Sequence, residues 1–211
     1  MNILDLLNRI FYKLEDILYD KMYRLDFSSS IAPAVPINDC SSAYMYAYPF
    51  QSVWRRNLRV IFAVIARHSV HFTNFVDLGC GKGKACIFAA TTKDVHFDNI
   101  IGIELDPTLI AVAFQNCLKL SIPNLNLSVS DATQYTLPNG NSVVFMFNPF
   151  NDEALKQFLN HNENHFALYD SYIAYANDMH RDVLIHAGFL QIYRDATRHL
   201  SLFAPPRILR F

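Results

Sequence analysis

Apolar side chains recur along this chain with two different periods, and the change between them divides the sequence into two parts. Residues 2–25 and 51–68 repeat apolar positions every three or four residues, which predicts two amphipathic helices. The intervening segment 27–43 contains several serines and two prolines and predicts a connecting loop. We therefore expect residues 1–69 to form an N-terminal helical extension.

Beyond residue 70, short apolar runs that predict strands alternate with helical patterns. The predicted strands are 72–78, 99–104, 125–129, 142–147, 171–176, 189–194 and 200–210, and the predicted helices are 82–92, 107–119, 151–160 and 179–187. This alternation predicts an α/β fold with a mostly parallel, seven-stranded sheet and helices on both of its faces. The last two strands are too close in sequence for a crossover helix, so the last strand should be antiparallel.

The helix predicted at 2–25 has one broad apolar face. Three interpretations are open: this face packs on the rest of the chain, makes a dimer contact, or lies on a membrane surface. Basic and acidic residues balance in this segment, so its composition has no cationic excess to favour anionic lipid. The face consists of Leu4, Leu7, Phe11, Leu14, Leu18, Met22 and Leu25, and Ile3, Ile10 and Ile17 widen it.

Composition and charge argue against several classes of protein. The chain is 52% hydrophobic with a net charge of −1, so we do not expect nucleic acid as a partner. No apolar run reaches the roughly 18 residues that cross a bilayer, and Asp5 and Arg9 do not fit a signal peptide. The cysteines form no CxxC pair, so we expect no metal site and reduced thiols in a cytoplasmic protein. These cysteines are Cys40, Cys80, Cys86 and Cys117.

Three of the six glycines lie within five residues, at Gly79, Gly81 and Gly83. They follow a predicted strand that ends in Asp77-Leu78 and precede a predicted helix, an arrangement typical of nucleotide-type sites. A dinucleotide fingerprint starting at Gly79 would need a sixth-position glycine where this chain has Lys84. No GK[ST] ends the turn, so a P-loop is also excluded. A carboxylate directly before the glycines favours a cationic ligand over a pyrophosphate.

The segment VDLGCGKGK, residues 76–84, resembles the first motif of the class I S-adenosylmethionine-dependent methyltransferases. The resemblance extends over residues 70–211 and implies a Rossmann-like domain that uses S-adenosylmethionine as cofactor. It implies that Asp77 faces the methionine ammonium group. It also implies that the loop of Gly79, Cys80, Gly81 and Gly83 binds the cofactor.

Two acidic residues after the glycine loop occur in the same order as acidic residues of this family's later motifs. Glu104 ends the predicted strand NIIGIE, and the resemblance implies that it binds both ribose hydroxyls while Leu105 lines the adenine. Asp131, followed by Ala132, comes after the next strand and is the residue that would accept a hydrogen bond from the adenine amino group.

Asn148-Pro149-Phe150 resembles a shortened form of the family's Asn-Pro-Pro-aromatic motif. In that motif the Asn oxygen accepts a hydrogen bond from the target amino group, which would make Asn148 the catalytic residue. The second proline is missing here, and this departure argues against a nucleobase substrate.

These features together predict a methyltransferase that methylates a nitrogen of a protein side chain or a small molecule. The alternative is a catalytically inactive, cofactor-binding scaffold protein. Residues 70–211 would form the cofactor-binding domain, and residues 1–69 would also cap its substrate side.

Two weaker signals stand outside these motifs. Tyr44, Tyr46 and Tyr48 predict either a strand edge in the core or a lid over the substrate. His161 and His165 have a spacing that metal sites use, but their polar surroundings favour a solvated helix end.

Overall fold

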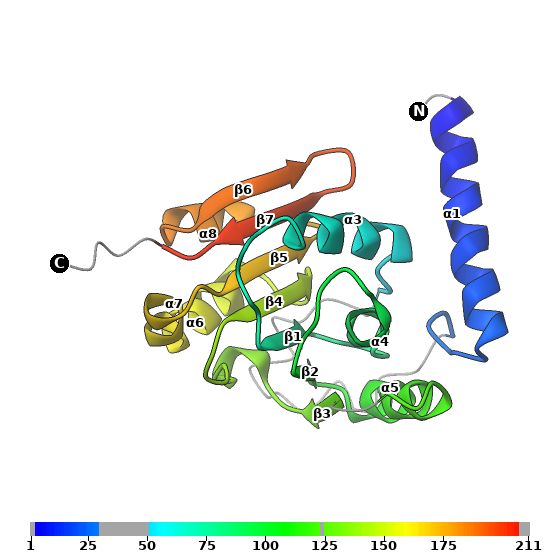
Figure 1. Cartoon of the computed structure of the whole chain (residues 1–211), viewed down its shortest axis with the longest axis horizontal. Coiled ribbons are helices and arrows are strands. Elements are labelled where there is room, and N and C mark those ends of the chain that lie inside the picture. Colours follow the sequence, from blue (N-terminus) through cyan, green and yellow to red (C-terminus); the bar gives the residue numbers. More distant parts are fainter. Residues whose placement is uncertain (1–2, 30–50, 123–124, 207–211) are drawn as a thin grey trace.

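A seven-stranded sheet forms the centre of the computed structural model, which describes residues 3–29, 51–122 and 125–206 (Figure 1). The strand order is β3-β2-β1-β4-β5-β7-β6. Strands β1 to β5 pair in parallel, and β7 pairs antiparallel with both β5 and β6, which confirms the predicted α/β architecture. The strands are β1 (Asn74–Leu78), β2 (Asn99–Glu104), β3 (Leu125–Val129), β4 (Ser142–Phe147), β5 (Tyr172–Ala176), β6 (Leu190–Asp195) and β7 (Leu200–Ala204).

Alternating side chains of β1 supply the two cores, one on each face of the sheet. Phe75 packs in a cluster with residues of α3 and α4, including Phe62 at a ring-centroid distance of 5.5 Å. Val76 belongs to the opposite cluster, which includes Phe158 of α6. Helices thus cover both faces, as predicted. They are α3 (Arg55–Ile65), α4 (Lys84–Thr91) and α5 (Pro107–Lys119) on one face, and α6 (Asp152–His161), α7 (Glu163–Leu168) and α8 (Arg181–His186) on the other.

Helix α7 and a short 3-10 turn, η1 (Ala132–Gln134), are absent from the sequence prediction. The residues before α7 are polar, but the Asn162 side chain accepts a hydrogen bond from Leu137 N–H and donates one to the Tyr135 carbonyl. His165 is buried and hydrogen-bonded to the Ser171 hydroxyl at 2.7 Å, so its interpretation as part of a solvated helix end was wrong. Specific polar bonds therefore bury Asn162 and His165 within a segment whose other residues from 160 to 165 are exposed.

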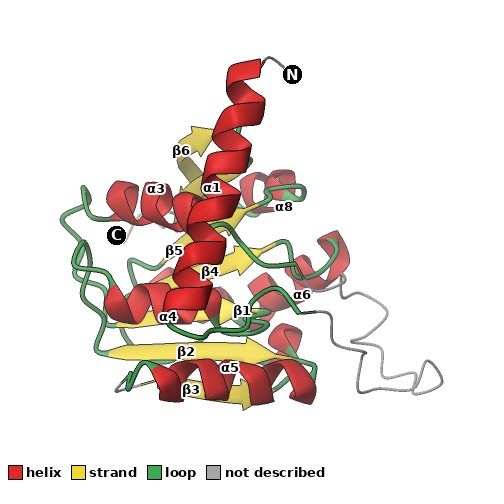
Figure 2. Cartoon of the chain, turned by 90° about the vertical axis from the view of Figure 1, so that its right-hand side faces the viewer, coloured by secondary structure: helices red, strands yellow, loops and turns green. Residues whose placement is uncertain are grey.

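Helix α1 (Ile3–Met22) stands along one side of the α/β body (Figures 1 and 2). Its apolar face points away from the body: Phe11 and Leu18 are each 63% exposed. The interpretation in which this face packs on the rest of the chain is therefore wrong for residues 7–22, whereas Leu25, beyond the end of α1, is buried with Phe27 and Ile87 as that interpretation expects. The described residues contain no helix with the length and hydropathy that a membrane crossing requires.

The division of the chain at residues 69 and 70 remains a prediction. Helix α3 lies before that boundary, yet its buried Leu58, Ile61 and Phe62 pack against the sheet. The predicted tyrosine row Tyr44, Tyr46 and Tyr48 lies outside the described residues.

Candidate functional site

The predicted site residues gather at the carboxyl ends of β1, β2 and β4. β1 lies between β2 and β4 in the sheet, and the chain leaves β1 in one direction to β2 and later returns to its other side at β4. This reversal opens a crevice at the carboxyl edge, where ligands of open parallel sheets bind. Asp77, Glu104 and Asn148 belong to, or directly follow, the ends of these three strands.

The glycine loop after β1 depends on left-handed backbone conformations. Gly79, Gly81 and Gly83 have φ values of +71°, +53° and +81°. A Cβ on Gly79 would lie 2.5 Å from the Cβ of Pro149, so the loop after β4 packs directly on the glycine loop. Gly83 is the N-cap of α4, and a Cβ there would come within 3.2 Å of Ala113 of α5. The loop therefore leaves no room for a side chain at Gly79, and a Cβ at Gly83 would require Ala113 to shift slightly.

Asp77 is a buried carboxyl that is only 3% exposed. The Cys86 thiol, 3.6 Å from Oδ2, donates to it. Among the residues that the structure describes, no lysine, arginine or histidine forms an ion pair with it. Burial, together with the nearby charge of Glu104, raises the pKa of Asp77 to about 8. A cation placed here would favour the ionised form.

Glu104 closes the glycine loop from the end of β2. Its Oε2 accepts a hydrogen bond from Gly81 N–H at 2.9 Å, and its Oε1 accepts from Leu105 N–H at 2.8 Å and Asp106 N–H at 3.1 Å. Burial raises the pKa of Glu104, although these backbone bonds oppose the shift. A carboxylate has about four acceptor positions, so one remains on Oε2. Binding two ribose hydroxyls would require Glu104 to give up at least one backbone bond.

Asp131 lies beside Glu104 because Ser130 N–H donates to the Glu104 carbonyl at 2.9 Å. Its Oδ1 caps η1 by accepting from the Thr133 N–H and hydroxyl at 2.9 and 2.8 Å. Asp131 and Leu105 are both half-buried, and Ala132 packs against the core on the α6 side of the sheet. Asp131 thus has a structural role that leaves its second carboxylate oxygen for a ligand.

Asn148 follows β4 with a positive φ of +45°. Its Oδ1 accepts a hydrogen bond at 2.9 Å from the hydroxyl of Tyr175, which is buried in β5. That hydroxyl also accepts from His180 N–H at 3.3 Å. These bonds hold the Asn148 amide at the sheet edge. Phe150 instead turns inward and packs in the core with Leu155.

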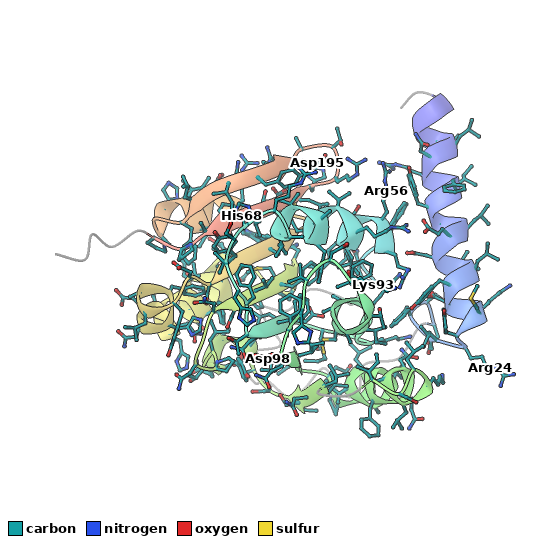
Figure 3. The ribbon with its side chains drawn as sticks, in the orientation of Figure 1. Arg24, Arg56, His68, Lys93, Asp98 and Asp195 are labelled. Carbon is teal, nitrogen blue, oxygen red and sulfur yellow. The ribbon has the colours of Figure 1, made fainter. Side chains whose placement is uncertain are left out.

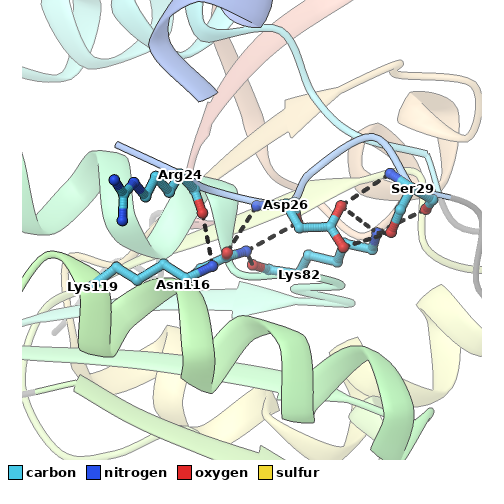
Figure 4. A network of polar contacts seen from close by, with 6 residues as sticks. All are labelled: Arg24, Asp26, Ser29, Lys82, Asn116 and Lys119. Atoms are coloured by element: carbon cyan, nitrogen blue, oxygen red, sulfur yellow. Dashed lines mark hydrogen bonds and ion pairs between the residues drawn. The ribbon is translucent and has the colours of Figure 1, made fainter. Parts of the chain in front are cut away.

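Two lysines of the loop region have roles that sequence reasoning missed. Lys82 is 1% exposed, and its Nζ donates to Asp26 Oδ1 at 3.1 Å and to the Ser29 carbonyl and hydroxyl at 2.7 Å (Figure 4). Lys84 Nζ binds Asp16 of α1 at 2.8 Å. The sequence shows two lysines flanking Gly83, which could have indicated such a role. Their partners could not be identified from it, because they lie more than 50 residues away in sequence.

Asn116 of α5 completes this attachment of the N-terminal segment. Its side chain accepts from Asp26 N–H at 2.9 Å and donates to the carbonyls of Asp26 and Lys82 at 3.0 and 3.1 Å (Figure 4). Residues 25–29, which we call the strap, therefore lie across the glycine loop.

A small pocket, with room for about one water-sized group, lies between the strap and the sheet edge. Asp77 and Gly79 line it on one side, and Phe27 of the strap and Phe147 of β4 supply apolar surface. Lys82 and Lys84 also line this pocket, and their ammonium groups are paired with Asp26 and Asp16.

Residues 75–165 match a family model described as a methyltransferase domain. A stretch of 62 residues is 39% identical to a tRNA (guanine-N(7)-)-methyltransferase of Pediococcus pentosaceus. That stretch covers 29% of this chain and only 28% of the relative's length.

Solved structures with the same fold include several methyltransferases. TrmN from Thermus thermophilus has a TM-score of 0.57 at 14% identity, over 75% of this chain and 50% of TrmN. A SAM-dependent methyltransferase from Aquifex aeolicus has a TM-score of 0.52 at 15% identity, over 72% of this chain and 91% of the other. M. capricolum TrmK in complex with S-adenosylhomocysteine has a TM-score of 0.50 at 13% identity, over 74% and 68% of the two chains. At these identities the likeness concerns the fold.

We predict that Gly79→Ala destabilises the protein by about 3 kcal/mol. An alanine would carry the left-handed backbone penalty of about 1–2 kcal/mol and would also collide with Pro149, overpacking that costs about 1–3 kcal/mol. Urea unfolding measures the change.

The matched control for this prediction is Gly188→Ala. Gly188 has a similar φ of +85°, but a Cβ there would meet Pro206 only at an ordinary 3.7 Å. The Gly188→Ala variant should be destabilised only by the cost of the left-handed backbone. Equal losses in the two variants would contradict the packing of Pro149 on the loop.

Proposed function

We propose that this chain, a member of the class I S-adenosylmethionine-dependent methyltransferase family, transfers the cofactor's methyl group to a nitrogen atom of a protein side chain or a small molecule. The observation that carries this proposal is the buried Asp77 carboxyl, which lines a pocket beside the glycine loop and lacks a cationic partner among the described residues.

The residues at the sheet edge fit the cofactor's chemical groups. Asp77 would hold the methionine ammonium, which supplies the positive charge that this buried carboxyl lacks. The bare backbone at Gly79 and Gly81 allows the close approach of a ligand. Glu104 offers its remaining acceptor position to a ribose hydroxyl, and Asp131 offers Oδ2 to the adenine amino group. Leu105, Cys80, Gly83 and Ala132 would complete the binding surface.

Asn148 is the residue that we place at the acceptor nitrogen. When bound, S-adenosylmethionine supplies an electrophilic methyl group on a positively charged sulfur. The sheet edge at Asn148 would hold an acceptor nitrogen in line with that methyl group, and solvent would take the proton that the nitrogen gives up. The Asn148 amide oxygen has a second lone pair beside the one bound by Tyr175, and this lone pair can orient an N–H of the acceptor.

The position of Phe150 bears on the class of acceptor. In the motif that Asn148-Pro149-Phe150 resembles, an exposed aromatic ring stacks on a planar substrate, whereas Phe150 packs in the core. The net charge of −1 supplies no general attraction for phosphates. These two observations favour a protein or small-molecule acceptor. The tRNA methyltransferases among the similar proteins keep nucleic acid open as an outcome of the experiment.

A second candidate function is a cofactor-binding scaffold without catalysis. The bond from Tyr175 to Asn148 favours it, because an amide already held by the protein has less capacity for a substrate.

We predict that Glu104→Ala weakens S-adenosylmethionine binding by about 10–100-fold. The variant removes both the ribose acceptor and three bonds that shape the loop, each contributing about 0.5–1.5 kcal/mol or more. Calorimetric titration measures the affinity, and Glu153→Ala, at an exposed position on α6, is the control. The absence of binding by the wild-type protein would refute the proposed function.

We also predict that Asn148→Ala lowers methyl transfer by at least about 100-fold while cofactor affinity changes little, as expected for loss of a positioned acceptor group. Cell extract incubated with isotopically labelled cofactor, followed by mass spectrometry, identifies the acceptor and gives the rate. Asn160→Ala, exposed on α6, should behave as wild type. Cofactor binding without any labelled product would favour the scaffold, and label in RNA would contradict the proposed acceptor class.

A further inference from the structure

Helix α1 stands along one side of the body (Figure 2) and carries a row of exposed apolar side chains. Single exposed apolar residues are common on protein surfaces, but a contiguous row on one helix indicates an interaction surface. We call it the outer face of α1. Its members are Leu7, Ile10, Phe11, Leu14, Ile17, Leu18 and Met22, with exposed fractions from 37% to 71%.

The opposite side of α1 is fastened to the body by aromatic and charged contacts. The Arg55 guanidinium lies 3.4 Å from the centroid of the Tyr19 ring, and Arg56 lies 3.7 Å from that of Tyr12 (Figure 3). Arg59 forms an ion pair with Glu15 at 2.5 Å. These contacts fix the rotation of the helix, so its outer face is held outward.

The charged side chains of α1 differ in exposure according to their sign. The acidic side chains Glu15, Asp16 and Asp20 are partly buried toward the body, where Arg59 and Lys84 form ion pairs with the first two. Over residues 6–24, the fully exposed charged side chains are all basic: Arg9, Lys13, Lys21 and Arg24. Arg24 extends away from the body at the foot of the helix (Figure 3). The balanced composition of the segment therefore conceals an excess of basic side chains among its exposed charges; Lys21 lies beside the outer face, and Arg9 and Lys13 lie on its flank.

We propose that the outer face of α1 lies on an anionic phospholipid membrane. Leucine, isoleucine and phenylalanine side chains would enter the boundary between headgroups and acyl chains, and the basic side chains would reach lipid phosphates. This is the arrangement of a helix that lies in the plane of the membrane surface, and it requires no helix that crosses the bilayer.

Charge favours a membrane over a second copy of the chain. In a two-fold contact the same surface meets itself, so the basic side chains along one helix would face those along the other. The exposed charged residues of α1 over residues 6–24 include no acidic side chain to pair with them. An anionic lipid surface matches both the apolar row and the basic side chains.

The experiment is flotation of the full chain with vesicles of pure phosphatidylcholine and of equimolar phosphatidylcholine and phosphatidylglycerol. We expect stronger binding to the anionic vesicles and weaker binding as salt rises. Phe11→Ser with Leu18→Ser should weaken binding at least about tenfold, because both apolar side chains lose their burial. Lys13→Gln and Lys21→Gln should each weaken it about fivefold.

The controls remove similar side chains elsewhere on the surface. Leu168→Ser, at a residue 64% exposed on α7, and Lys156→Gln, on α6, should leave binding unchanged. Equal binding of the wild type to both kinds of vesicle, or unchanged binding of the Phe11 and Leu18 variant, would overturn the proposal. The proposal would also be overturned if the wild type did not bind vesicles and were a dimer in solution, and if the Phe11 and Leu18 variant were a monomer.

Discussion

A buried carboxyl that has no cationic partner in the part of the chain that the structure describes is the constraint on which the proposed site depends. The sheet carries Asp77 to the end of β1, where burial raises its pKa to about 8. A buried ionised carboxylate is strongly unfavourable unless it is paired, so the group keeps a proton until a cation arrives. The loop beside Asp77 has the features of a ligand-binding loop. Three left-handed glycines expose the backbone, Pro149 packs on Gly79, and Glu104 fixes Gly81. The proposed cofactor, which combines an ammonium group with ribose and adenine, would use all of these features.

The N-terminal segment is joined to the same loop by two lysines. Lys82 binds the strap and Lys84 binds α1, so the cofactor loop and the exposed helix share one set of polar contacts. Lys82 is buried because Asp26 and Ser29 satisfy its ammonium group, which would otherwise be too costly to remove from water. These bonds place the outer face of α1 on the same side of the molecule as the strap.

Strand patterns and the glycine loop could be predicted from sequence because they depend on local constraints. The bounds of β2, β3, β4 and α5 agree with the periodic runs, and Pro107 marks the start of α5. Other features depend on contacts between distant residues. The orientation of α1 follows from Arg55, Arg56 and Arg59 on α3, and the apolar period of α1 alone suggested the reverse packing. Helix α7 follows from the side-chain bonds of Asn162, and the inward position of Phe150 follows from its packing against α6.

The most direct test of the central claim is proton release when the cofactor binds. At about pH 6.5, Asp77 carries a proton in the free protein, and the cofactor's amino group is already charged. Binding the ammonium lowers the pKa of Asp77 and should expel up to one proton. Calorimetric titration with S-adenosylmethionine in two buffers of different ionisation enthalpy measures that number. The account predicts nearly one proton for the wild type and none for Asp77→Asn. Binding without proton release, or equal release by both proteins, would contradict it.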